Sequence, residues 1–498
     1  MPLPPTMTAS ANIGSLRRAD LPDAPAVTGF EWVLLMTTLV SALAGFAFES
    51  NRQLALLAEF TFGIELTLVG VAVVESFRNK VMGKTLLAGA MVAFYYQDAF
   101  RMVTGDVPFN AGSAPVSGGQ FDPAIVQLGL VYVAVFQLML FVGYSCRVKL
   151  YGVCRWVRSR SDRRGRAAWS WRYVFAAFAI LPLFLSFSWD PAAVQDAISA
   201  SRSGTATVDA SDIGLLGHLF YFGMYGCGLL LVEGLFFRKI GRVPSLLLTG
   251  VLGVPVIFGA TRHITVFVIL PAVAVALKRV KGRIPLNKAI GWGLLVLLLL
   301  GLTQLQLAVR NNGWQALGEV TTEDLATPGV GEFGATLFAL YLVPDRHEYF
   351  LEPIEPYFVI HWIPRSVWTN KPIPESWAYY NASYTQGAAY NVTPSVIGQF
   401  HLNFGLPGVV YIGLLLGFLM ATTDRAMMAV NLERQLAMSV LLGSMYAFLV
   451  SSFRFFHPLY FAYVLFAAIA MTALTRRVSA MRAPARRNPA ELPRVRHA

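Results

Sequence analysis

Twelve apolar runs restrict the fold of this chain more than any other feature of its sequence. They lie near residues 30–50, 54–75, 81–98, 123–145, 173–188, 213–236, 243–260, 264–277, 289–307, 405–421, 436–452 and 458–475. The hydrocarbon core of a bilayer is about 30 Å thick, and a helix of roughly 20 apolar residues crosses it with its backbone hydrogen bonds satisfied. We therefore predict an all-α polytopic membrane protein with about twelve transmembrane helices.

The positions of the basic residues predict how these helices are oriented. With the N-terminus inside, 31 of the 40 Lys and Arg residues fall in segments on the cytoplasmic side, including 146–172 and the tail. Cytoplasmic loops are enriched in Lys and Arg, and one helix more or fewer would reverse every later loop. Both termini are therefore expected in the cytoplasm. The net charge of +12 is then a topology signal beside anionic lipids, and no nucleic-acid partner is expected.

The predicted helices divide the chain into five parts. A polar cytoplasmic leader (1–29) precedes helices one to nine (30–307), and the last three helices (405–475) precede a basic cytoplasmic tail (476–498). Between them lies a large external loop (308–404), and loops of this length are usually functional. Its apolar runs FGATLFALYLVP and EPYFVIHWIP are too short to span a bilayer, so we expect re-entrant or interfacial helices over the bundle.

Motifs of soluble nucleotide and metal enzymes are missing or incomplete. MGKT (Met82–Thr85) lacks the upstream glycine of a phosphate-binding loop, and RHEY (Arg346–Tyr349) lacks the second histidine of a zinc-protease helix. The sequence has no Asp-x-Asp pair, and its three cysteines have neither disulfide nor zinc spacing. We expect chemistry that uses no metal or other cofactor.

Basic side chains gather on the expected external face. Arg262 lies in the turn GATRHIT, Arg310 follows the ninth helix, and Arg365 and Lys371 lie in IPRSVWTNKPIPESW, a stretch rich in proline and tryptophan. A guanidinium offers a planar fork of donors that matches phosphate oxygens, and an ammonium adds a compact charge. Together these residues predict a diphosphate-binding site, although external arginines also pair with lipid phosphates or cap helices.

A reaction at a hydroxyl group also needs a general base, and histidine or a carboxylate is the usual choice. The external segments offer five candidates: His263, His361, Glu375, Tyr380 and His401. We rank His401 first and Glu375 second, and each is also compatible with a structural role. Three carboxylates inside the apolar runs are costly in lipid and are expected to face the bundle interior, as polar partners or as a proton path: Glu59, Glu65 and Glu233.

Three stretches resemble a known family. IPRSVWTNKP (Ile363–Pro372), followed by TPSVIGQFHLNFGLPGVVYIGLLLGF (Thr393–Phe418), resembles the bacterial O-antigen and oligosaccharide repeat-unit polymerases of the Wzy type. The turn GATRHITVFVILP (Gly259–Pro271) is similar to the Gly/Ser-x-Arg turn of the same family. The resemblance covers the twelve-helix layout and most of residues 243–421. One departure is Gln399, which stands where the family segment has a glutamate.

The resemblance implies a metal-independent glycosyltransferase of the bacterial inner membrane, with a periplasmic active site. Its donor is a growing glycan on undecaprenyl diphosphate, and its acceptor is one lipid-linked repeat unit whose hydroxyl attacks the anomeric carbon. Arginines in periplasmic loops matter in this family, and the matching positions here are Arg262 and Arg365, with Lys371 beside the latter. Arg310 is a weaker candidate for the diphosphate. A chain-length regulator is expected as a partner on the same ground.

Two other functions stay open at the level of sequence. A flippase or other transporter of lipid-linked oligosaccharides fits twelve helices, although transporters often show internal repeats and none is visible here. An O-antigen ligase would share the cation chemistry and differ in its acceptor.

Overall fold

The computed structural model describes residues 24–47, 51–104, 122–146, 148, 151–159, 214–236, 262–280, 331–352, 368, 370, 372, 374–385, 394–432 and 435–456. Within these ranges the chain is helical and contains no strand, which confirms the all-α prediction for this part. Four predicted spans (173–188, 243–260, 289–307 and 458–475) lie outside the described residues, so the count of twelve stays a prediction.

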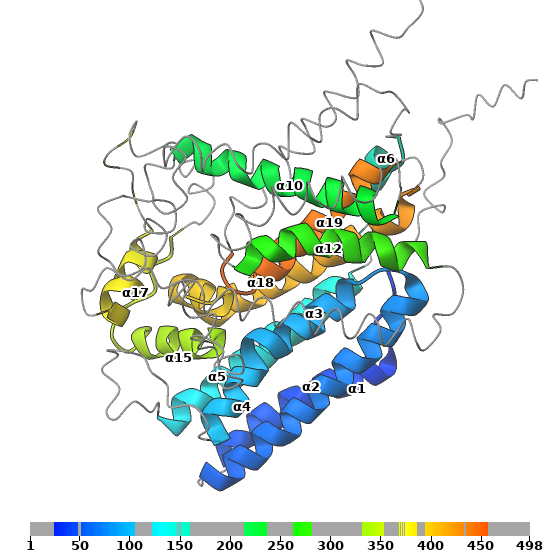
Figure 1. Cartoon of the computed structure of the whole chain (residues 1–498). Helices are drawn as coiled ribbons and strands as arrows, with labels where there is room; N and C mark the ends of the chain where they lie inside the picture. The colour runs from blue at the N-terminus through cyan, green and yellow to red at the C-terminus, as the bar shows by residue number, and fades with distance from the viewer. Residues whose placement is uncertain are drawn as a thin grey trace, which may run out of the picture.

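Helices occupy each of the predicted spans that the structure describes (Figure 1). They are α1 (Gly29–Ala44) with η3 (Gly45–Ala47), α2 (Asn51–Asn79), α3 (Gly83–Met91) continuing through the π-helix η4 (Val92–Tyr96) into α4 (Gln97–Thr104), α5 (Pro123–Ser145), α10 (Gly214–Phe236), α12 (Arg262–Arg279), α18 (Val396–Ala429) and α19 (Leu436–Ser451). Three further helices lie between these spans: α6 (Tyr151–Ser159), α15 (Glu332–Leu342) and α17 (Glu375–Thr385). Within the described residues, four helices are long and apolar enough to cross a membrane: Gly29–Ala47, Ala55–Asn79, Pro123–Ser145 and Val396–Ala429.

Local sequence explains where these helices begin and end. Thr28 and Glu31 form a capping box at the start of α1, with reciprocal backbone hydrogen bonds of 3.3 and 2.6 Å. Asp122 accepts the amide of Ala124 at the start of α5, where Pro123 needs no backbone partner. Lys80, in the left-handed region at φ 61°, ends α2 and allows a tight turn into α3.

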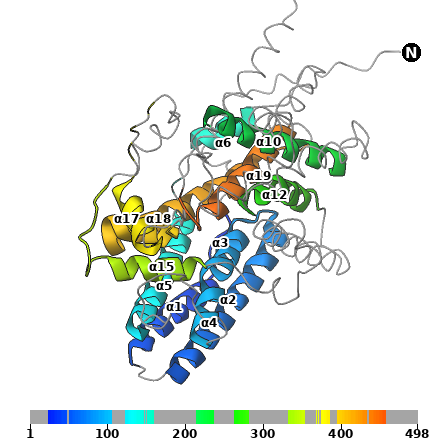
Figure 2. The same ribbon diagram turned by 60° about the vertical axis from the view of Figure 1, so that its left-hand side comes forward.

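The helices run in alternating directions, so their termini gather at two opposite ends of the bundle (Figures 1 and 2). At one, which we call the Lys84 end, the start of α1 and the end of α2 meet the start of α3 and the ends of α5 and α18. At the other, which we call the α15 end, α15 meets the start of α18 and the turn after α19. Lys278, at the end of α12, donates to the carbonyl of Val430 at 2.6 Å, so α12 also finishes at the Lys84 end. This is the alternation that the predicted spans require.

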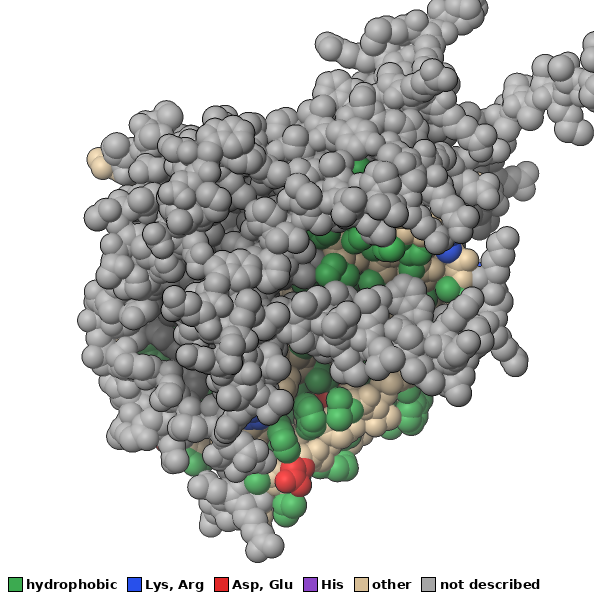
Figure 3. All heavy atoms as spheres, in the orientation of Figure 1, with side chains coloured by type: hydrophobic (Ala, Val, Ile, Leu, Met, Phe, Trp, Pro, Cys, Tyr) green, Lys and Arg blue, Asp and Glu red, His purple; other side chains and the backbone are tan. Residues whose placement is uncertain are grey.

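The first two helices carry apolar side chains outward and polar ones inward. Val33, Val40 and Val74 are 60%, 59% and 69% exposed, and hydrophobic side chains cover much of the described surface in Figure 3. Exposed apolar side chains along two long helices suit lipid rather than water. Together with the four long apolar helices, it indicates a membrane protein.

A chain of polar side chains lies inside this part of the bundle. Glu65, fully buried, accepts hydrogen bonds from Thr38 at 2.8 Å and from Gln137 at 2.5 Å, and Gln137 in turn accepts one from Tyr96 at 2.6 Å. Buried polar groups in lipid need such partners. The prediction that Glu65 faces the interior is therefore confirmed.

The other two membrane carboxylates have different outcomes. Glu233 is 1% exposed, so its predicted interior position is also confirmed. Glu59 is exposed, and the prediction for it was wrong. It lies in the first turns of α2, near a helix end, where a long polar side chain reaches the interface without crossing the bundle.

Glycines let α5 and α18 pack backbone against backbone. Gly413 and Gly417 of α18 form a Gly-x-x-x-Gly pair, and Gly143 faces them from α5. A Cβ atom at Gly417 would overlap the carbonyl oxygen of Leu140, and one at Gly143 would overlap that of Leu414. Small residues at such positions allow close helix approach in membranes, where dispersion contacts replace the hydrophobic effect.

Candidate functional site

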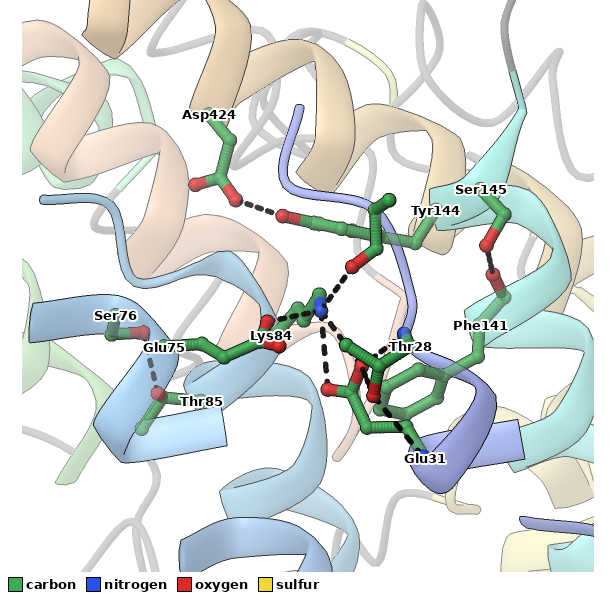
Figure 4. A network of polar contacts seen from close by, with 11 residues as sticks. Thr28, Glu31, Glu75, Ser76, Lys84, Thr85, Phe141, Tyr144, Ser145 and Asp424 are labelled. Atoms are coloured by element: carbon green, nitrogen blue, oxygen red, sulfur yellow. Dashed lines mark hydrogen bonds and ion pairs between the residues drawn. The ribbon is translucent and has the colours of Figure 1, made fainter. Parts of the chain in front are cut away.

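The MGKT segment is engaged in internal contacts at the Lys84 end (Figure 4). Lys84, 3% exposed, donates to Glu31 at 2.8 Å, to Glu75 and to the carbonyl of Ala26 at 2.6 Å. The neighbouring Thr85 shares a hydrogen bond of 2.7 Å with Ser76 of α2. Through these contacts MGKT joins the residues before α1 to α1, α2 and α3. We therefore assign MGKT a structural role.

Asp424 extends this junction to the other helices. It is fully buried and accepts hydrogen bonds from the amide of Gly83 at 3.1 Å, from Tyr446 at 2.5 Å and from Tyr144. The amide of Gly83 is at the start of α3, where helix N–H groups and the helix dipole favour a carboxylate. A protein carboxylate therefore occupies the N-terminus of α3.

The α15 end is built differently, around a short helix from the predicted external loop. Ten of the eleven residues of α15 are buried, and the helix packs against α18, α5 and α4. Thr336 of α15 shares a hydrogen bond of 2.5 Å with Ser395 at the start of α18, and Glu332 forms an ion pair of 3.1 Å with Arg454 after α19. FGATLFALYLVP is therefore packed inside the protein, and the prediction of a re-entrant or interfacial helix stays a prediction. The second run, EPYFVIHWIP, lies outside the described residues.

The serine and the two glycines of the segment SVIGQFHLNFG have roles in the backbone geometry of α18. Ser395 caps α18 by accepting the amide of Gly398 at 3.0 Å, and Gly398 lies close to Ala339 of α15. Gly405 has φ +63° and ψ −150°, a conformation that side chains disfavour, and it breaks the helix at the predicted loop boundary. The helix therefore begins at Val396, before the predicted span 405–421, and it bends at Gly405, where that span begins.

The loop after α15 donates hydrogen bonds to the two carbonyl groups of α18 that lose their helical partners at this kink. Pro407 has no N–H to give to the carbonyl of Asn403, and the break at Gly405 separates Leu402 from its next turn. The amides of Phe350 and Leu351 donate to Leu402 and Asn403, each at 3.1 Å. The kink thus fixes residues 350–351 against the start of α18.

Gly405 gives a direct test of this arrangement. We expect Gly405→Ala to destabilise the protein, because alanine at φ +63° is strained by roughly 1 kcal/mol or more and its Cβ would lie 3.0 Å from the ring of Tyr349. Thermal unfolding in detergent measures the loss. Gly29→Ala is the matched control, since no atom lies within 4 Å of an added Cβ there; equal melting temperatures for the two variants would contradict the strain.

His401, the first-ranked base, lies inside the protein on the first part of α18. It is 2% exposed, and its Nε2 is 2.8 Å from the carbonyl oxygen of Val343. Its Nδ1 is buried and has no hydrogen-bond partner in the described structure. The rings of Tyr132 and Tyr349 contact it edge to face. The structure therefore holds this histidine in one orientation with one nitrogen unused.

Glu375, the second-ranked base, begins α17 with an exposed side chain. Its amide donates to the carboxylate of Glu352 at 2.8 Å, and Ser376 adds an amide and a hydroxyl bond at 3.1 and 3.0 Å. Glu352 thus caps α17 from a distant part of the chain, a role that sequence spacing did not indicate. Ser376 in turn accepts a hydrogen bond of 3.3 Å from Asn403, which joins α17 to α18.

The predicted cations are described only in part. Arg262 is the first residue of α12, whose direction puts it at the end opposite the Lys84 end, but the side chain is outside the described residues. Arg310, Arg365 and Lys371 also lie outside them. Their assignment to a diphosphate therefore stays a prediction.

Gln399, where the family pattern has a glutamate, has a structural partner. Its side-chain oxygen accepts the amide of Phe456 at 3.2 Å, so it holds the turn after α19 against α18. An amide suits this contact because it can also donate to the same residue's carbonyl, which lies 3.5 Å away.

No protein-family model, no curated protein and no solved structure matches this chain. The resemblance to repeat-unit polymerases therefore stays a prediction from the residues.

Proposed function

We propose that this chain is a membrane glycosyltransferase that polymerises undecaprenyl-diphosphate-linked repeat units into a surface polysaccharide. The observation that carries the proposal is the contact between the second of the longer stretches that resemble the polymerases and α17, the helix that follows the first stretch in the sequence. Asn403 of the second stretch donates to Ser376, which follows the first, and Glu352 fixes the same helix terminus. Lys371 precedes α17 by four residues in the sequence, which supports the assignment of the cations to this end of the protein.

The proposed chemistry needs few protein groups. The acceptor hydroxyl attacks the anomeric carbon, the bond from that carbon to the diphosphate oxygen breaks, and undecaprenyl diphosphate leaves as the anion. Arg262, Arg365 and Lys371, with Arg310 as a weaker candidate, stabilise the charge that develops on the leaving group, as preorganised cations do. His401, or in second place Glu375, accepts the proton of the hydroxyl.

Location and partners follow from the same proposal. The Lys84 end and both termini face the cytoplasm, and the α15 end faces the periplasm, because the basic segments follow helices that finish at the Lys84 end. The protein works in the inner membrane on two lipid-linked glycans, and a chain-length regulator is its expected partner.

Deletion of the gene followed by gel analysis of the surface glycan tests this function. A polymerase deletion leaves lipid capped with one repeat unit and no ladder. Unattached long polymer would instead identify a ligase, and lipid-linked repeats accumulating in the cytoplasm would identify a flippase.

Arg365→Ala tests the cation assignment within that function. We expect chain extension to fall by roughly 100- to 1,000-fold, because one preorganised donor to a developing anion is lost. Ladder density per membrane-inserted protein measures the effect. Arg78→Ala, at an exposed position at the end of α2, is the control. Near-wild-type ladders from Arg365→Ala would exclude the assignment.

A further inference from the structure

The contact between His401 and Val343 determines which nitrogen of the histidine carries the proton. The carbonyl oxygen of Val343 only accepts hydrogen bonds, so the Nε2 that lies 2.8 Å away donates to it. In the neutral ring, Nδ1 then holds the free lone pair. Nδ1 is buried and has no hydrogen-bond partner in the described structure. It is therefore a hydrogen-bond acceptor to which no described donor is bonded.

The surroundings of the ring show from which side a donor can reach it. Tyr132 belongs to α5 and is 9% exposed, with its ring centroid 5.1 Å from that of His401 at an interplanar angle of 83°. Tyr349 belongs to the irregular loop after α15, is half-buried, and lies 5.7 Å away at 82°. Of these two ring contacts, Tyr349 is the one that a ligand can displace without moving a helix.

We propose that Nδ1 of His401 takes the proton of the acceptor hydroxyl, and that the main-chain carbonyl of Val343 is the positioning group that keeps this nitrogen unprotonated and correctly aimed. The inference rests on the proposed function. The hydroxyl enters beside Tyr349 and donates to Nδ1. As its oxygen bonds to the anomeric carbon, the bond to the diphosphate breaks, the proton stays on Nδ1, and it passes to water after the products leave.

The same pairing of a ring N–H with a fixed acceptor orients histidine bases in other enzymes, because the bond selects one tautomer. It also explains why His401 sits at the start of α18. The loop that supplies Val343 is bonded to the kink at residues 402–403, so base and orienting group belong to one rigid unit.

Two amide substitutions separate this role from a structural one. The side-chain amide of His401→Gln reaches the place of Nε2 and can donate to Val343, but it offers no base at the place of Nδ1. His401→Asn puts its amide near Nδ1 and cannot reach Val343. We expect His401→Gln to melt close to wild type and its rate of chain extension to fall on the order of 100-fold or more. We expect His401→Asn to show both a slower rate of extension and a lower melting temperature.

The assay uses the full-length protein in vesicles with a purified lipid-linked repeat unit. Extension by His401→Gln at more than about a tenth of the wild-type rate would overturn the inference and leave His401 a structural residue. Should His401→Gln fail to fold, the wild-type pH profile decides: we expect extension to fall at acid pH as the base takes up one proton, and a profile with no fall on the acid side would contradict it. Wild-type protein that extends nothing would instead refute the proposed function.

Discussion

Gly417→Leu is expected to disrupt the packing of α5 against α18 and to lower the melting temperature of the protein in detergent by about 3 °C or more. A Cβ atom at Gly417 would already overlap the carbonyl oxygen of Leu140, so the backbones must move apart. Overpacking of a rigid interface costs about 1–3 kcal/mol, and the present clash is with backbone rather than with a flexible side chain. We expect a cost at the upper end of that range.

Gly70→Leu is the matched control for this prediction. Gly70 is an exposed residue of α2 with no atom within 4 Å of an added Cβ. Leucine there adds an apolar side chain to a face that already exposes Val74 and Leu66, so it is expected to leave the melting temperature unchanged or slightly higher. If Gly70→Leu and Gly417→Leu unfold together, the close approach of α5 and α18 is not the cause.

Lys84→Met is expected to cost about 3–5 kcal/mol of folding free energy, since it leaves the carboxylates of Glu31 and Glu75 without their shared cation. Removal of one partner of a buried ion pair leaves an uncompensated charge, which is more costly than the loss of the pair as a whole. Thermal unfolding and the yield of membrane-inserted protein measure the effect.

Two further variants isolate the charge. Lys80→Met removes a nearby, half-buried lysine and is expected to melt close to wild type. The triple variant Glu31→Gln, Glu75→Gln, Lys84→Met removes the whole charged group and is expected to recover most of the stability. A triple variant as unstable as Lys84→Met would show that lost packing, not charge, destabilises the single variant.

Hydropathy and charge predicted the helices and their alternation, because apolar length and basic flanks are written directly in the sequence. The predicted span 123–145 coincides with α5, and α10 and α12 begin and end within two residues of their predictions. The predicted span 405–421 begins later than α18, because glycine at 405 and proline at 407 are typical of a helix boundary in sequence. In the structure they bend a helix that has already begun at Val396.

The contacts within the candidate site were not predictable in the same way. Glu352 caps α17 and Asn403 bonds Ser376 across sequence separations of more than twenty residues, and no local pattern records such pairs. The burial of His401 and its bond to Val343 likewise depend on where the loop after α15 returns to α18. The Gly-x-x-x-Gly of Gly413 and Gly417 could have been found, because small residues at that spacing in an apolar helix indicate close packing.

Purified protein in lipid vesicles, supplied with only an undecaprenyl-diphosphate-linked repeat unit, gives the most direct test of the proposed polymerase. The product is separated by glycan length on a gel. We predict a ladder of two and more repeat units with release of undecaprenyl diphosphate and no requirement for an added metal or nucleotide. Repeat units that stay single in the presence of well-folded protein, or that only change leaflet, would contradict the proposal.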